Sequence, residues 1–496
     1  MSIVETSSNS HIVMVERGQV SPTPRVHYLV HDFDVPTGVS RLTVRLRYRK
    51  ERLCQLFMAL FDPERYRGTR MNPGGYGQIE LELMLGEREA GPGALAGPLP
   101  PGRWRAMIDI ERTAETADYE IEAIAEFGMV GDVASAAVAA DEVVSVAEPE
   151  GEGVPDAART GRNAGWYRGE LHAHSWHSDG KMPVEAVVEA ARAYGLDFLA
   201  LTDHFTNAGW SDLRGRGGPD LLLMRGLEIT AHSGHANLHG AGAWINPYVD
   251  GPALTPSGES VEVGPGGVPW DINAAASATR DRGGLFCVNH PFAGDLGWRY
   301  HQFDWGLADL MEIYHHLEGP HNALALGLWD EQLRAGRRLI GVAGIDSHHP
   351  REGRHRLGQC FTYVHTPELS EAGIIEGLRS GRAYVSLGPQ LEFWAEGADG
   401  MRTEMGGRTP TPGPLRLRVE LRDLRYPGRL YVLKNGFYHE TFAVEPGRDV
   451  VTIEVEDVPT SPGYYRLELY LAHPQEQTRS FRQTDSLLVL SNPIWT

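Results

Sequence analysis

The stretch Tyr-Arg-Gly-Glu-Leu-His172-Ala-His174-Ser-Trp-His-Ser-Asp179-Gly, residues 167–180, is the most informative part of this chain. It leads into an amphipathic helix expected over residues 183–194, and a proline suits the first turn of such a helix. The apolar strand that follows the helix runs into Asp203-His204. Two histidines at spacing two, a nearby carboxylate and a further Asp-His pair are the ligand types of a metal site.

From about residue 166 to 390 apolar strands alternate with amphipathic helices, which is typical of a parallel sheet or barrel. We expect strands over 197–202, 222–230, 285–289, 310–314 and 339–345, and helices over 183–194, 271–282, 322–335 and 370–380. This segment holds 16 of the 21 histidines, which indicates a site. Candidate ligands stand at or near five strand ends, and in a (β/α) barrel these ends meet on one face. They are His172, His174, Asp203, His204, Glu228, His290, Asp346 and His348.

Strand geometry explains the spacing of these candidates, because residues i and i+2 point to the same side of a strand. His172 and His174 can therefore reach one ion, and Asp346 and His348 can reach one ion or two adjacent ions. Imidazole and carboxylate ligands suit zinc, manganese or iron. The candidates include no cysteine, which disfavours a structural thiolate zinc site.

Each piece of the pattern also has a structural explanation when it is taken alone. Asp203 can cap the following segment, and Glu228 can be a paired core carboxylate. Their combination at five strand ends favours the metal interpretation. Other histidines stay open: His177 can support a ligand, face the substrate or be exposed to solvent. Of the three that follow Glu228, one is expected to bind metal; they are His232, His235 and His239. Hydrogen-bonded neighbours are the simpler interpretation of His315, His316 and His349.

Two strand-rich segments flank the α/β segment. Residues 1–130 show about seven short strand patterns separated by Pro and Gly clusters, as in a β-sandwich. Residues 131–165 are rich in Ala, Gly and acidic residues and have the composition of a linker. Residues 391–496 predict a second, smaller β-sandwich, with Lys434-Asn435-Gly436 as a hairpin turn. The metal-binding domain is thus expected over 166–390.

Composition limits the possible partners and location. The chain has 496 residues, 46 basic and 66 acidic, for a net charge of −20, which argues against nucleic acid as the main partner. No apolar run is long enough to cross a membrane. The N-terminus does not resemble a secretory signal, so we expect a cytoplasmic protein. The three cysteines are far apart and form no CxxC zinc pattern; they are Cys54, Cys287 and Cys360.

The motif order resembles the PHP (polymerase and histidinol phosphatase) superfamily of metal-dependent hydrolases. The matching elements are His172-x-His174-x4-Asp179-Gly180, Thr202-Asp203-His204, Glu228, His290-Pro291 and Asp346-x-His348. The layout is more similar to the CehA/McbA-like branch. Its loop after Glu228 resembles residues 234–240, and its flanking β-domains resemble residues 101–104 and 491–495.

This resemblance implies a distorted seven-stranded (β/α) TIM-like barrel with two or three divalent ions (Mn, Zn or Fe). By motif, one ion would be held by His172, His174 and Asp346, and Glu228 would bridge to a second. His235 and His290 would complete the second site, with His239 as a nearby competitor of His235. The third ion would be held by Asp179, His204 and His348.

The implied activity is hydrolysis of a small ester-type substrate by a metal-activated hydroxide, with two ions about 3.5 Å apart. The superfamily suggests phosphoesters, and the closer branch suggests carbamate or carboxyl esters. Lys181, Arg299 and Arg354 lie in loops expected on the site face and are candidate phosphate clamps, although each is also an ordinary surface cation. The sequence names no separate general acid, and the oligomeric state stays open.

Two other classes of function compete with this one. A non-catalytic metal-binding module would use the β-sandwiches to bind a partner or carbohydrate, but the ligand set is intact. A nuclease is disfavoured by the acidic charge of the chain.

Overall fold

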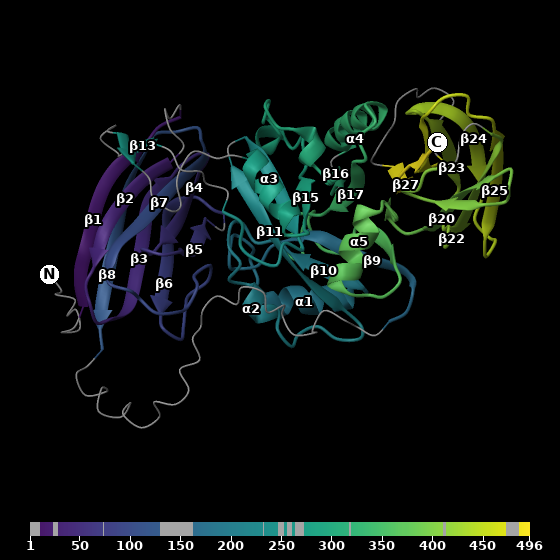
Figure 1. Ribbon diagram of the computed structural model, residues 1–496. Coiled ribbons are helices and arrows are strands. Elements are labelled where there is room, and N and C mark those ends of the chain that lie inside the picture. Colours follow the sequence, from purple (N-terminus) through teal and green to yellow (C-terminus); the bar gives the residue numbers. More distant parts are fainter. Residues whose placement is uncertain are drawn as a thin grey trace.

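The computed structural model shows three parts that follow one another along the molecule: an N-terminal β-sandwich, a central α/β part and a C-terminal β-rich part (Figure 1). The linker expected over 131–165 lies almost entirely outside the described residues, as does His232. The structure describes residues 10–22, 28–72, 74–128, 162–231, 233–246, 252–254, 260–262, 272–316, 319–409, 413–472 and 486–496.

The N-terminal part consists of two four-stranded antiparallel sheets, in the orders β1-β8-β3-β6 and β2-β7-β4-β5. One strand more is present than the sequence indicated, because β5 contains Arg and Gly and lacks an apolar pattern. The strands are β1 Ser10–Val20, β2 Tyr28–Val35, β3 Val39–Lys50, β4 Cys54–Phe61, β5 Tyr66–Met71, β6 Gly77–Gly86, β7 Gly102–Thr113 and β8 Ala117–Phe127.

Successive side chains of a strand point to opposite faces, so the first sheet has one face buried in the sandwich and one face exposed to solvent. In β3, Leu42, Val44 and Leu46 point into the sandwich core. Between them, Arg45 and Arg47 point outward and form ion pairs with glutamates on β6 and β8. Cross-strand pairs of opposite charge favour this register over a one-residue shift, which would bury the arginines.

The second sheet is buried on both faces, since all eight residues of β4 are buried. Leu56 and Leu60 belong to the sandwich core. The residue between, Phe57, belongs instead to a cluster shared with Phe205 and Ile229 of the central part. The N-terminal sandwich therefore packs one sheet face directly against the α/β part.

The central part alternates strands and helices in the predicted order. Its principal elements are β9 Gly165–Ala173, α1 Val184–Ala193, β10 Phe198–Leu201, α2 Trp210–Leu213, β11 Leu222–Ala231, β12 Gly234–His239, β13 Pro252–Leu254, β14 Ser260–Glu262, α3 Ile272–Asp281, β15 Leu285–Val288, β16 Leu310–His315, α4 Gly319–Arg334, β17 Ile340–Gly344, β18 Phe361–Thr366, α5 Glu371–Arg379 and β19 Ala383–Ser386. No helix among the described residues is both long and apolar enough to cross a membrane.

The sheet of the central part differs from the predicted barrel. Its order is β17-β16-β15-β12-β11-β10-β9-β18-β19, and β12 and β18 run antiparallel to their neighbours. One parallel bridge joins Ala173, the last residue of β9, to Ser347 in the loop after β17, the first strand of this order. The α/β class is confirmed, but a closed TIM-like barrel is not shown. Residues 234–239, expected as a loop, form strand β12.

The C-terminal part contains two sheets, ordered β27-β26-β23-β24 and β21-β20-β22-β25. The predicted hairpin turn is confirmed: Asn435 and Gly436 join β23 to β24, both with positive φ, as a type I′ turn requires. The strands are β20 Gln390–Gly397, β21 Arg402–Glu404, β22 Leu415–Arg422, β23 Gly428–Lys434, β24 Phe437–Val444, β25 Val451–Asp457, β26 Tyr464–Leu471, β27 Leu487–Ser491 and β28 Ile494–Trp495.

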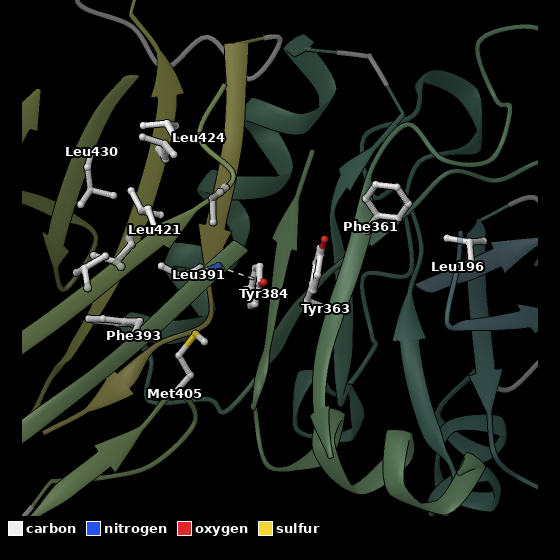
Figure 2. Close-up of a cluster of buried hydrophobic side chains, with 14 of the residues drawn as sticks. Leu196, Phe361, Tyr363, Tyr384, Leu391, Phe393, Met405, Leu421, Leu424 and Leu430 are labelled. Carbon is white, nitrogen blue, oxygen red and sulfur yellow. Dashed lines mark hydrogen bonds between the residues drawn. The ribbon is translucent and has the colours of Figure 1, made fainter. Parts of the chain in front are cut away.

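The border expected at residue 390 is crossed by a continuous sheet, because β19 pairs with β27. One hydrophobic cluster also spans it, and Figure 2 follows that cluster from Leu196 and Phe361 to the C-terminal strands. In its middle, the rings of Tyr363 and Tyr384 stack with centroids 4.7 Å apart. The Tyr384 hydroxyl accepts a hydrogen bond from the backbone N–H of Leu391 at 3.2 Å (Figure 2). The two parts thus share a core.

A buried ion pair holds the same two parts together elsewhere. Arg466 of β26 has no exposed surface and donates two hydrogen bonds to Asp330 of α4, at 2.8 and 2.7 Å. Its remaining terminal nitrogen donates to Glu468 at 2.7 Å. Loss of Asp330 would leave two buried N–H groups of the Arg466 guanidinium without their acceptors.

We expect Asp330→Ala to lower the free energy of unfolding by about 3–5 kcal/mol, because Arg466 would stay buried without its bidentate partner. Glu456→Ala, which breaks an exposed pair with Arg416, is the matched control and should cost less than about 1 kcal/mol. Urea unfolding followed by circular dichroism measures both. Equal losses in the two variants would contradict the role given to the buried pair.

Candidate metal centre

The strand ends of the central sheet bring all nine sequence-predicted ligands to one place. His172 is the penultimate residue of β9, His290 lies two residues beyond β15, and Asp346 lies two residues beyond β17. Glu228 lies inside β11 and not at its end. Because β12 runs antiparallel, its second residue, His235, reaches the side where the neighbouring strands end.

The first group of ligands surrounds Glu228 and Asp346 and is completely buried or nearly so. The Nε2 atoms of His172 and His174 lie 3.2 and 3.3 Å from Glu228 Oε2. The same two nitrogens lie 3.3 and 2.9 Å from Asp346 Oδ1. Two imidazoles and two carboxylates thus offer four ligand atoms to one point.

The second group uses the other oxygen of Glu228. His235 Nδ1 lies 3.3 Å from Glu228 Oε1, and His290 Nε2 lies 3.7 Å from it. Asn289 donates its side-chain N–H to the same oxygen at 2.8 Å, which orients the carboxylate. Glu228 therefore stands between two groups, as a bridging ligand does.

The third group forms around Asp179, on the loop between β9 and α1. Its oxygens lie 3.4 Å from His204 Nε2 and 3.0 Å from His348 Nε2. His174 belongs to this group as well as to the first. Asp203 lies outside the three groups. It accepts hydrogen bonds from the backbone and hydroxyl of Ser175 and from the hydroxyl of Ser178, and so holds the loop that carries Asp179.

Electrostatics show that this cluster is built for positive charge. Burial opposes protonation of His172, but Glu228, Glu312 and Asp346 outweigh it and raise the pKa of His172 well above its usual value. Burial disfavours ionised Glu228, yet His172 and His204 hold its pKa well below the usual range. The positive charge favoured on His172 thus balances the negative charge favoured on Glu228.

Buried polar atoms without hydrogen bonds give a direct test of whether the residues fit divalent ions. Among the described residues, several buried atoms make no hydrogen bond, including His172 Nε2, Asp179 Oδ1 and Glu228 Oε2. Such atoms are costly unless something compensates them. These three atoms face the three groups, and nitrogen and oxygen donors of this kind suit zinc, manganese or iron. The donor set fits the expected ions.

Glu312 is a functional residue that the sequence interpretation missed. It lies in β16, its Oε1 atom is 2.7 Å from His172 Nδ1, and its Oε2 atom accepts from the backbone N–H of His290 at 2.8 Å. A carboxylate in this position holds the proton on Nδ1 and leaves Nε2 free for an ion. Its only signal in the sequence was an acidic residue inside the apolar strand Leu-Met-Glu-Ile-Tyr.

A second missed residue comes from the N-terminal sandwich. Glu111 of β7 is 2% exposed, and its Oε1 atom lies 3.1 Å from His235 Nε2. Burial lowers the pKa of His235, but the carboxylates of Glu111 and Glu228 outweigh burial and raise this pKa to about 9. No sequence pattern near residue 111 points to this role, because the contact exists only after the two parts pack together.

Backbone strain is concentrated at the same strand ends. Phe205, His290, His316 and Asp346 have φ between +25° and +57°, and they make up four of the six non-glycine residues with positive φ in the described part of the chain. Left-handed backbone is unfavourable for such residues and tends to persist where function requires it.

The histidines that the sequence left open are now placed. His177 accepts from the backbone N–H of Gly93 at 3.1 Å, and its Nε2 lies 3.0 Å from Asp212, so it joins the N-terminal sandwich to the loop. His239 joins none of the ligand groups, and burial lowers its pKa to about 3. His235 therefore takes the position for which His239 was the competitor.

The three proposed phosphate clamps are exposed: they are Lys181, Arg299 and Arg354. The backbone N–H of Lys181 donates to the carbonyl of His348 at 2.8 Å, which places its chain beside the third group. The Arg299 guanidinium donates to the Asp295 carbonyl. Their role in substrate binding stays a prediction.

We expect Glu312→Gln to weaken binding of the most tightly held ion about 10- to 100-fold, because the amide cannot hold the proton of His172 as a carboxylate does. Competition with a chromogenic chelator measures the affinity. Glu331→Gln, on the exposed face of α4, is the control and should bind as the wild type does. Unchanged affinity in Glu312→Gln would remove this residue from the site.

Glu111→Gln should also weaken metal binding about 10- to 100-fold, although Glu111 lies in another part of the chain. The control is Glu82→Gln, on the solvent-facing side of the same sandwich. The metal content of both variants after dialysis against a weak chelator decides the point. If both keep the wild-type content, the N-terminal sandwich does not support the site.

Comparison with known proteins matches residues 170–237 to the PHP domain. No protein with a curated description matches the chain. Similar solved structures include a two-domain protein from Bacteroides vulgatus containing a predicted PHP-like metal-dependent phosphoesterase (16% identity, 68% of this chain, 97% of that chain, TM-score 0.36). They also include a lesion-specific endonuclease from Pyrococcus furiosus (14% identity, 43% of this chain, 56% of that chain, TM-score 0.32). A third is an amidohydrolase from Chromobacterium violaceum (17% identity, 37% of this chain, 88% of that chain, TM-score 0.25).

TM-scores below 0.5 do not establish a shared overall fold, so the family match carries the comparison. It covers less than half of the chain but includes six of the nine ligands, from His172 to His235. No comparison bears on the CehA/McbA-like branch. Over residues 170–237, the resemblance to the PHP superfamily that the motifs suggested is confirmed.

Proposed function

We propose that this chain is a metal-dependent hydrolase that cleaves small phosphoesters. The observation that carries the proposal is the set of three contiguous ligand groups, joined through Glu228 and His174. Divalent ions held in such groups acidify water and stabilise negative charge that develops on oxygen. The match to the PHP domain over residues 170–237 supports the same class of chemistry.

The residues of the chain prepare the site in stated ways. Glu228 presents one oxygen to each of two groups, and Asn289 keeps that carboxylate in place. Glu312 holds the proton on His172 Nδ1, so that Nε2 faces the centre. Phe57 of the N-terminal sandwich lies beside His204, with ring centroids 6.3 Å apart, and packs in one apolar cluster with Phe205 and Ile229.

Charge balance favours an anionic substrate over a neutral ester. The three ligand carboxylates, the supporting Glu111 and Glu312 and the nearby Asp203 carry six negative charges, which three divalent ions would balance. Arg70 of β5 adds a partly buried cation: it donates to the backbone carbonyl of Ser178 at 3.0 Å, on the loop of Asp179. A phosphate monoester would be attracted by this cation, whereas a neutral carbamate or carboxyl ester would not. The net charge of −20 disfavours a nucleic-acid polymer.

The test is a comparison of chromogenic substrates with manganese-loaded enzyme. We expect 4-nitrophenyl phosphate to be hydrolysed faster than a naphthyl acetate or a naphthyl carbamate. Asp346→Ala should lower that activity by at least about 100-fold, because it removes a carboxylate of the first group. Asp281→Ala, on the exposed end of α3, should retain it.

Three outcomes would contradict the proposal. Faster turnover of the ester or carbamate would move the substrate class to uncharged esters. Full phosphatase activity in Asp346→Ala would show that the ligand groups do not perform the reaction. Binding of metal without hydrolysis of any of these substrates would favour the alternative of a non-catalytic metal-binding module.

A further inference from the structure

A separate cluster of three histidines lies beside the nine-residue centre. His315 is the last residue of β16, His316 follows it, and His355 lies in the loop after β17. One imidazole nitrogen from each lies within 4.8 Å of the other two. The rings of His315 and His316, and those of His316 and His355, have centroids 4.1 Å apart. None of the three belongs to the nine ligands that the motifs predict.

The surrounding structure holds these rings in place. The Asn322 side chain, 2% exposed on α4, accepts from the backbone N–H of His315 at 2.8 Å and donates to the backbone carbonyl of His316 at 3.2 Å. His355 Nδ1 donates to the carbonyl of Ile345 at 3.2 Å, which leaves its Nε2 lone pair free. A hydrogen bond of this kind at the far nitrogen is the arrangement that orients metal-binding histidines.

Backbone strain supports a function for this cluster. His316 has φ +31°, a left-handed conformation that it shares with His290 and Asp346 of the nine-residue centre. That conformation turns two consecutive histidines toward the same point, whereas consecutive residues of a strand point to opposite sides. The structure thus accepts an unfavourable backbone in order to gather three imidazoles.

We propose that His315, His316 and His355 together bind one divalent zinc ion that is additional to the ions of the nine-residue centre. Three imidazoles with an open fourth position form a recognised zinc ligand set. The His315 and His290 rings lie 4.7 Å apart, so this ion would adjoin the centre. It would add positive charge beside Asp346, whose Oδ2 atom lies 4.0 Å from His315 Nε2. The site goes beyond the proposed hydrolysis, and zinc binding there does not require that any substrate be cleaved.

The experiment counts zinc ions per chain in tag-free protein. The double variant His316→Asn and His355→Gln removes two imidazoles; asparagine tolerates the positive φ at 316. The control is His301→Gln, an exposed histidine outside the cluster. Each protein is stripped with chelator, reloaded with zinc, freed of excess by gel filtration and analysed by mass spectrometry of the metal. Circular dichroism and the melting temperature of the stripped proteins report folding.

We expect the double variant to retain one zinc ion fewer than the wild type, while His301→Gln retains the full number. Equal zinc content in all three proteins would overturn the proposal. So would the loss of two or more ions in a folded double variant, since the cluster would then support the nine-residue centre. If the double variant does not fold, His355→Gln alone is judged by the same criterion.

Calorimetric titration with inorganic phosphate distinguishes a zinc site from an anion site at the three-histidine cluster. The proposal expects stripped wild-type protein and the stripped double variant to bind phosphate equally. If the double variant kept all its zinc but lost affinity for phosphate, the cluster would be an anion site and the zinc assignment would be wrong.

Discussion

A single buried carboxylate, Glu228, is the interaction on which the rest of the structure depends. It has no exposed surface, and its two oxygens lie within 3.7 Å of nitrogens of five histidines. A buried carboxylate is tolerable only beside compensating positive charge, so β11 can place Glu228 there only if several strands deliver imidazoles to the same point. The strand order of the central sheet, the reversed direction of β12 and the strained backbone of His290 and Asp346 all serve that requirement.

The compensation extends beyond the ligands. Glu312 and Glu111 each contact the far nitrogen of a histidine that faces Glu228. Glu312 comes from strand β16 and Glu111 from the N-terminal sandwich. The sandwich is therefore part of the site's construction and its cover, which explains why β4 and β7 are buried on both faces although they belong to a flanking domain. The C-terminal part is fixed to the central part through β19, which pairs with β27, and through α4, which carries Asp330 of the pair with Arg466.

Much of the site was predictable because strand periodicity and ligand chemistry are local properties. His-x-His at spacing two and Asp-x-His after an apolar run need no tertiary contact to be recognised, and the structure brings these residues together. β12 was missed because Gly-His-Ala-Asn-Leu-His lacks the β-branched composition of a strand. Glu111 and Glu312 were missed because a supporting carboxylate has no spacing rule of its own. The closed barrel was expected by analogy, and the antiparallel strands β12 and β18 are a feature that hydrophobic patterns cannot reveal, since a strand has the same pattern in either direction.

The sequence by itself determined the succession of β-rich, α/β and β-rich segments and the metal-ligand types, because each is written in short-range pattern and residue chemistry. Together with the family resemblance it indicated nine candidate ligands, with His239 as the competitor of His235. Only the tertiary structure decided that His174 belongs to two groups, that His235 and not His239 reaches Glu228, and that the N-terminal sandwich contributes Glu111. It also decided that His315, His316 and His355 meet. These are contacts between residues distant along the chain, and their distances follow from how sheets curve and pack, which no local pattern encodes.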